Sequence, residues 1–163
     1  MTPRESTLVH EAAHAVGGLL AGHRIDRVHI GATKRRPGDA GCTTFDFAGS
    51  PDVNMFGHVV AILMGPMAEG LPPLPWPPNP DPDHTDAFNV ATLVNHLALS
   101  KSDYMAAVAL ADRWLDNPQV KTAIARVAQA LGEVGELTDR GVRDALGSEL
   151  VRWIAHEAEP CSI

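Results

Sequence analysis

Two histidines and a glutamate near the start of this 163-residue chain have the types and spacing needed for metal chemistry. His10-Glu11-Ala12-Ala13-His14 reads H-E-x-x-H, a pattern typical of zinc sites. Residues four apart on a helix lie on one face, so both imidazoles can reach a single ion. Glu11 lies about 100° round the axis from His10, near enough to act on a water molecule without binding the metal. The pattern therefore predicts that His10 and His14 bind Zn2+ and that Glu11 is the catalytic base.

The segment that carries this motif has the pattern of an amphipathic helix. At Thr2-Pro3-Arg4-Glu5, a capping threonine, a proline in the first turn and a glutamate three residues after the cap predict its start, and Gly22 predicts its end. One stripe at helical spacing is apolar and consists of Leu8, Ala12, Ala15, Val16 and Leu19. His10 and His14 lie roughly opposite that stripe on a helical wheel. We therefore expect the helix to bury its apolar side and to turn the two histidines towards another surface.

The composition is that of an ordinary globular chain, with 45% hydrophobic and 20% charged residues. The length predicts one domain over residues 1–157, followed by a frayed tail at 158–163. A formal net charge of −7 argues against nucleic acid as a partner. The longest apolar run, Val59 to Met64, is far shorter than a membrane span, so no membrane association is expected.

Cysteine usage and the first residues bear on the location of the protein. Cys42 and Cys161 are the only cysteines and lie far apart, which excludes a disulfide framework and favours the reducing cytoplasm. The first residues lack the charged and apolar regions of a signal peptide. The sequence contains no G-x-x-x-x-G-K-[ST] phosphate-binding loop, so any activity is expected to be independent of ATP.

The remaining pattern predicts a mainly α fold of the α+β class. Alternating residues over 25–30 and strand-forming residues over 42–47 predict a small antiparallel β unit after the first helix. Ser50-Pro51 predicts the start of a second helix, and Pro66 should kink or end it. A proline-rich and acidic loop follows at 71–85. Further helices are expected directly after this loop, at 104–115, at 120–131 and from Thr138-Asp139 to Trp153.

A catalytic zinc site needs a third protein ligand besides the two histidines, with one position left open. The acidic segment before the third predicted helix offers Asp83, His84 and Asp86. Helix capping is a competing role for this segment, since Asp83 and Thr85 can cap a helix without any metal. A side chain in the first helical turn is held more rigidly than one in the preceding loop, as a catalytic site requires. The residues alone leave the choice among the three open.

Several segments resemble the peptidase domain of the FtsH family of ATP-dependent zinc proteases. That family has an H-E-A-G-H-A helix, and His10 to Ala15 reads H-E-A-A-H-A. Its G-R-A-A-E segment is similar to Gly65 to Glu69, and its D-x-x-x-A-T segment is similar to Asp86 to Thr92, which is one residue longer. Weaker similarity covers the segments 27–30, 41–45 and 125–146, so that the resemblance extends from about residue 3 to about residue 150.

The resemblance implies a helical zinc-peptidase domain that hydrolyses peptide bonds. It implies that Asp86 is the third metal ligand, because the family's ligand is an aspartate at the start of the corresponding helix, while the one-residue offset keeps His84 as an alternative. It also implies that the strand at 41–45 holds the substrate backbone. Glu69 is expected either to orient one of the two histidines or to be an exposed surface carboxylate. The family's ATPase ring and membrane anchor are missing from this sequence, so we expect a stand-alone peptidase that acts on unstructured polypeptide segments.

Two other functions are compatible with the sequence. The chain could be a binding protein whose closed four-ligand site, completed by His84 or Asp83, is purely structural. The glutamate at position 11 argues against this reading, since a structural site needs no base. The chain could also be a zinc hydrolase of a non-peptide amide, which only substrate trials separate from a peptidase. The identity of the substrate, a homo-oligomer and a separate partner protein are left open.

Overall fold

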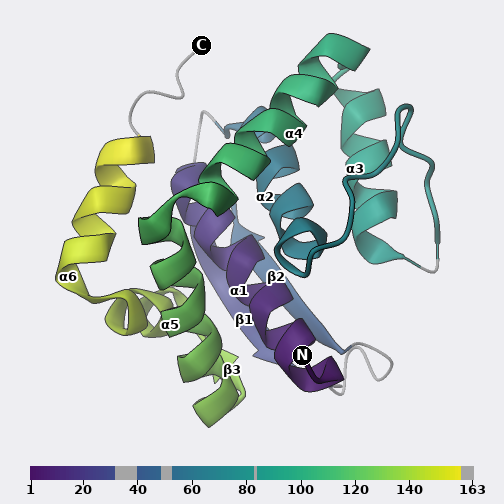
Figure 1. Cartoon of the computed structure of the whole chain (residues 1–163). Coiled ribbons are helices and arrows are strands. Elements are labelled where there is room, and N and C mark those ends of the chain that lie inside the picture. Colours follow the sequence, from purple (N-terminus) through teal and green to yellow (C-terminus); the bar gives the residue numbers. More distant parts are fainter. Residues whose placement is uncertain (32–39, 49–52, 83, 159–163) are drawn as a thin grey trace.

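The computed structural model describes residues 1–31, 40–48, 53–82 and 84–158 (Figure 1). This part of the chain contains six helices and three strands, so the predicted mainly α fold of the α+β class is confirmed. In chain order the elements are α1 (Pro3–Leu20), β1 (Arg24–Ile30), β2 (Gly41–Asp46), α2 (Met55–Ala68), α3 (Thr85–His96), α4 (Lys101–Asp116), α5 (Pro118–Val134), β3 (Glu136–Leu137) and α6 (Asp139–Ala158).

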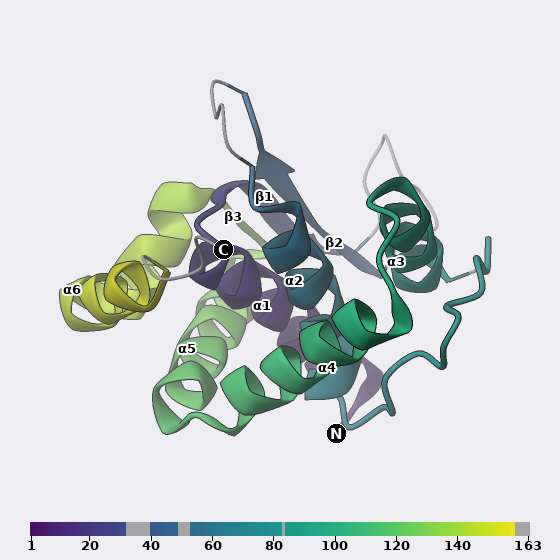
Figure 2. The same cartoon turned by 90° about the horizontal axis from the view of Figure 1, so that it is seen from above.

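Helix α1 lies at the centre of the fold, where Figures 1 and 2 show it surrounded by α2, α5 and the sheet. Its start is the predicted capping box, in which Glu5 N donates to Thr2 Oγ1 at 3.2 Å and Thr2 N donates to Glu5 Oε2 at 2.7 Å. Every residue from Glu11 to Leu20 is buried. The expected apolar stripe is buried from Ala12 to Leu19, and the opposite side of this half of the helix is buried as well, because neighbouring elements cover it all round.

A three-stranded antiparallel sheet in the order β2-β1-β3 packs on α1. The register pairs Val28 of β1 with Thr43 of β2 and with Leu137 of β3. Paired residues share one face of a sheet, and this face is turned towards α1, since the Thr43 hydroxyl reaches Glu11. The predicted antiparallel unit is confirmed: β1 begins one residue earlier than expected, and β2 begins and ends one residue earlier. Strand β3 has two residues, too few to leave a readable pattern, and was not predicted.

Helix α2 packs along α1 and begins at Met55, capped by the side chain of Asn54. The predicted start at Ser50-Pro51 lies outside the described residues. The helix ends two residues after Pro66, as expected from the missing N–H of proline. Close approach of the two helices requires a small residue at Gly17, because a Cβ there would lie 3.0 Å from a Cα of α2.

The proline-rich stretch at 71–82 connects α2 to α3 without helix or strand, as predicted for a loop. Tyr104 of α4 fastens it: the hydroxyl donates to Leu74 O at 2.8 Å, and the ring lies against Trp76. Tyr104 is fully buried, and burial raises its pKa to about 12. These contacts set the path of the chain from α2 towards the start of α3.

The predicted helices at 104–115 and 120–131 are confirmed as parts of α4 and α5. The last helix begins at Asp139 as predicted, but Gly147, with φ of 79° and ψ of 161°, divides α6 into two parts. Of the predicted tail, Ala158 belongs to α6 and the remainder lies outside the described residues. No helix in the described part of the chain is long and apolar enough to cross a membrane.

Candidate metal centre

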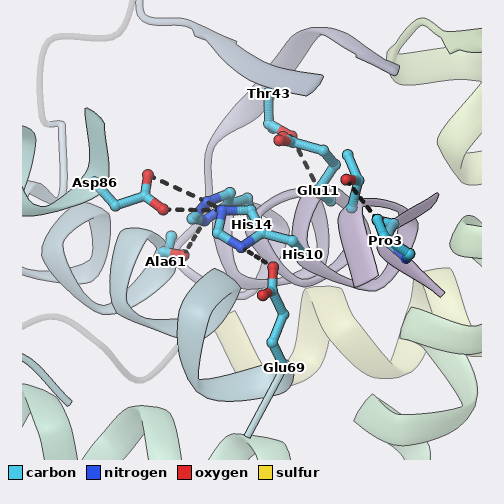
Figure 3. A network of polar contacts seen from close by, with 9 residues as sticks. Pro3, His10, Glu11, His14, Thr43, Ala61, Glu69 and Asp86 are labelled. Carbon is cyan, nitrogen blue, oxygen red and sulfur yellow. Dashed lines mark hydrogen bonds and ion pairs between the residues drawn. The ribbon is translucent and has the colours of Figure 1, made fainter. Parts of the chain in front are cut away.

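His10 and His14 of α1 and Asp86 of α3 lie together in the folded chain (Figure 3). The Nε2 atoms of the two histidines are 2.9 Å apart. His10 Nε2 is 2.9 Å from Asp86 Oδ2, and His14 Nε2 is 3.4 Å from Asp86 Oδ1. The structure thus brings together the three side chains expected to be ligands, from two helices that are far apart in the sequence.

These separations suit a tetrahedral zinc shell. Bonds of about 2.0–2.1 Å at tetrahedral angles place neighbouring ligand atoms about 3.3 Å apart. The observed distances of 2.9 Å and 3.4 Å are close to that edge length. Among the described residues, no fourth His, Cys, Asp or Glu joins the group. The described residues thus offer three protein ligands, the number that is typical of catalytic zinc sites.

The contacts of the rings indicate which nitrogen faces the site. His14 Nδ1 lies 2.9 Å from the carbonyl oxygen of Ala61 in α2, which can only accept, so this nitrogen carries a proton. His10 Nδ1 lies 2.6 Å from Glu69 Oε1, also an acceptor. Both Nε2 atoms face each other and the Asp86 carboxylate. The grouping of two imidazole nitrogens and a carboxylate at these distances is the observation that favours a metal ion between them.

Without a metal ion, protons take the place of that cation. Burial alone would lower the pKa of His14, but the hydrogen bond and the negative charge of Asp86 outweigh burial and raise this pKa to about 9. Burial would likewise raise the pKa of Asp86, yet hydrogen bonds from His10 and His14 hold it well below its ordinary range. Binding of a metal ion therefore releases protons from the site.

Helix α2 and the residue that caps its end hold the rings of both histidines. Ala61 supplies the carbonyl that contacts His14, and Glu69 supplies the carboxylate that contacts His10. At Gly65 a Cβ would overlap the His14 ring, so the glycine allows the backbone of α2 to pass close to that ring. Of the two roles expected for Glu69, the structure favours orientation of His10, because the side chain is only 20% exposed and points at the ring.

Asp86 projects from the first turn of α3, and the residue before that turn caps the helix. This residue is His84, whose Nδ1 accepts a hydrogen bond from Ala87 N at 3.5 Å. His84 lines the same cavity as the ligand group but is not part of the group. Asp83 lies outside the described residues. The structure therefore brings Asp86, and not His84, to the two histidines.

Glu11 lies beside the ligand group, and only 6% of it is exposed. Its Oε2 accepts a hydrogen bond from the Thr43 hydroxyl at 2.7 Å. Burial raises the pKa of Glu11, while the charge of His14 and the hydrogen bond from Thr43 act in the opposite direction. The sequence pattern did not mark Thr43 as a site residue, because its approach to Glu11 depends on the pairing register of β1 and β2.

One cavity of about 560 Å³ contains these groups. The ligand group, Glu11 and residues of β2 line it. Its lining also includes Ile62 and the rings of Phe45, Phe47 and His58, which contact one another. Burial, with smaller contributions from the charges of neighbouring histidines, lowers the pKa of His58 to about 4, so that ring is neutral at pH 7. The cavity can thus accept an apolar side chain next to the polar ligand group.

A scan against known protein families and a search of curated proteins found no match for this chain. The interpretation of the site therefore depends on the geometry of the described residues. They place three converging ligand atoms and a buried carboxylate in one cavity. A metal site with a neighbouring base can activate a water molecule.

Proposed function

We propose that this protein is a zinc-dependent peptidase of the H-E-x-x-H type. The observation that carries the proposal is the three-ligand group with Glu11 buried beside it, in a cavity that has a β-strand as part of its wall. The resemblance of the motif segments to the FtsH peptidase domain supports the same activity and belongs to the proposal.

Each residue of the site has a role in this proposal. His10, His14 and Asp86 would hold the zinc ion. As a Lewis acid, the ion would lower the pKa of a water molecule to about 7 and polarise the carbonyl group of the substrate. Glu11 accepts the proton of the attacking water and later donates it to the leaving amine. Its raised pKa makes the carboxylate a stronger base, and burial limits its access to bulk water. Glu69 keeps the His10 ring in place.

An extended polypeptide is the substrate that this cavity fits best. Within the described sheet β2 pairs only with β1, so its second edge is open to an added strand. Residues of β2 line the cavity next to the ligand group, which would place the backbone of an added strand near the metal. A stably folded protein does not expose such a segment, and the sequence has no nucleotide-binding loop. We therefore propose cleavage of unstructured segments without ATP, in the cytoplasm that the cysteine usage favours.

The proposal is tested by measuring zinc content together with hydrolysis of unfolded casein, with and without ATP. About one zinc ion per chain and casein cleavage that ATP does not change are expected. Cleavage of a stably folded protein that begins only when ATP is added contradicts the proposal.

Two results would favour the other functions. A zinc-loaded protein that leaves casein intact but hydrolyses a small amide would be a hydrolase of non-peptide amides. A zinc-loaded protein that hydrolyses neither substrate would be a metal-stabilised binding protein.

A further inference from the structure

The two carboxylate oxygens of Glu11 have different surroundings. Oε2 accepts a hydrogen bond from the Thr43 hydroxyl at 2.7 Å, as Figure 3 shows. The same hydroxyl lies 3.1 Å from the backbone carbonyl oxygen of Glu11. A hydroxyl has one proton, and the shorter contact to the charged acceptor is the stronger one. Thr43 therefore ties one oxygen of Glu11 to β2, while no hydrogen bond to Oε1 is seen among the described residues.

Gly41 confines the same side chain from a second direction. It lies two residues before Thr43 in β2, and side chains two apart in a strand point to the same face. A Cβ at Gly41 would lie 2.8 Å from Glu11 Cγ and 2.9 Å from Glu11 Oε1. Glycine is therefore the residue that leaves room for the glutamate in its observed position.

We propose that Thr43 and Gly41 are positioning residues for Glu11, which they hold with Oε2 on the threonine and Oε1 directed to the reacting water. The inference rests on the proposed peptidase function and deepens it. A base must be held within about 0.5 Å of its productive position, and Thr43 and Gly41 both act on the Glu11 side chain. Strand β2 thus has two tasks: its open edge receives the substrate, and its α1-facing side holds the base.

Three substitutions separate positioning from a general effect on the fold. Thr43→Val keeps the shape of the side chain and removes the hydroxyl, Thr43→Ser keeps the hydroxyl, and Gly41→Ala adds the methyl group that meets Glu11. Displacement of a catalytic group by about 1 Å can cost about 100-fold in rate. We expect Thr43→Val and Gly41→Ala to lower kcat about 10- to 100-fold, with KM and zinc content within about twofold of the wild type. Thr43→Ser should keep kcat within about threefold.

A second measurement is independent of activity. The carboxyl carbon of Glu11 is followed by NMR in the zinc-free protein labelled with 13C-glutamate, and its signal is identified by its loss in Glu11→Gln. The signal should move in Thr43→Val and stay in place in Thr43→Ser. Thr44→Val is the matched control, because that neighbouring hydroxyl contacts Asp26 at 3.0 Å instead of Glu11. Thr44→Val should leave the signal unchanged.

The outcomes distinguish this inference from the proposed function. A Glu11 signal that does not move in Thr43→Val overturns the positioning role, whether or not the protein cleaves any substrate. Wild-type kcat in Thr43→Val, or equal damage in Thr43→Ser and Thr43→Val, overturns it as well. If the signal moves as expected but the wild type hydrolyses nothing, the contact is upheld and the peptidase function fails.

Discussion

At the scale of single residues, neighbouring groups orient both histidine rings, so that their Nε2 atoms face Asp86. The H-E-x-x-H spacing predicted His10, Glu11 and His14, and the family resemblance added Asp86, which the structure brings to the two rings. The carbonyl oxygen that holds His14 could not be predicted in the same way. Every residue has a backbone carbonyl, so only the packing of two helices shows which one is used.

The third ligand can be tested by comparing Asp86→Asn with His84→Ala. Asparagine has nearly the same shape as aspartate but lacks the charge that faces both histidines, whereas His84 only caps α3. Loss of an outer-shell partner typically costs 10- to 100-fold in metal affinity, and loss of a ligand should cost about 100-fold or more. We expect that loss in Asp86→Asn and less than about threefold in His84→Ala, with helical circular dichroism retained in both. The opposite pattern in chelator competition would assign the ligand to His84.

His58, which lines the cavity, is expected to make the stability of the protein sensitive to acid. Burial lowers the pKa of His58 to about 4 in the folded protein, whereas an unfolded chain titrates near 6.5. Between these values the unfolded state binds more protons, so the free energy of unfolding decreases as the pH falls from about 6.5 to about 4. At pH 5 the loss is up to about 2 kcal/mol.

His58→Phe should remove the contribution of His58 to this pH dependence, because an aromatic ring without a titrating nitrogen can still pack against Phe45 and Phe47. The shifted pKa values of His14 and His23 affect both proteins alike. Urea unfolding of the zinc-free proteins at pH 7 and pH 5 measures the difference. We expect the free energy of unfolding to decrease less in the His58→Phe variant between pH 7 and pH 5. Equal losses in both proteins would mean that His58 does not carry the effect.

At the scale of elements, the crossing of α1 and α2 determines the geometry of the site. The capping box of α1 and the end of α2 near Pro66 could be predicted, because caps and prolines act within a few residues. The close approach of the helices at Gly17 and Gly65 could not, since a glycine in a sequence does not show which side chain faces it. The sequence likewise does not show that Gly147 adopts the positive φ that divides α6 into two parts.

Gly65→Ala should damage the metal site through this crossing. Its Cβ would overlap the His14 ring, so either the ring or α2 must move, and overpacking of this kind costs about 1–3 kcal/mol. We expect lower stability and a zinc affinity reduced at least about tenfold. Gly132→Ala in α5 is the matched control, since the added methyl group would meet only the flexible end of Leu8 at 3.3 Å. Equal zinc affinities in the two variants would show that the helix crossing does not determine the site.

At the scale of the whole molecule, the site forms only when α1, β2 and α3 meet in the folded chain. The sequence predicted the fold class and most helices from local periodicity, but the short strand β3 and the strand register are set by long-range pairing. The register places Thr43 on Glu11, and the proline-rich loop, fastened by Tyr104, leads to the helix that carries Asp86. Local patterns therefore indicated which residues could react, and tertiary packing determines how they are held.

The role of Glu11 as the general base of a zinc peptidase can be tested with the substitution Glu11→Gln. Glutamine is nearly isosteric with glutamate, and Glu11 is not among the ligand atoms, so the variant should keep its zinc. A missing general base typically costs about 100- to 10,000-fold in rate. Zinc content and the rate of casein hydrolysis are measured on the same preparations of wild type and variant. We expect equal zinc content and a turnover reduced by that factor; a variant that stays fully active, or one that loses its zinc, would show that Glu11 does not have this role.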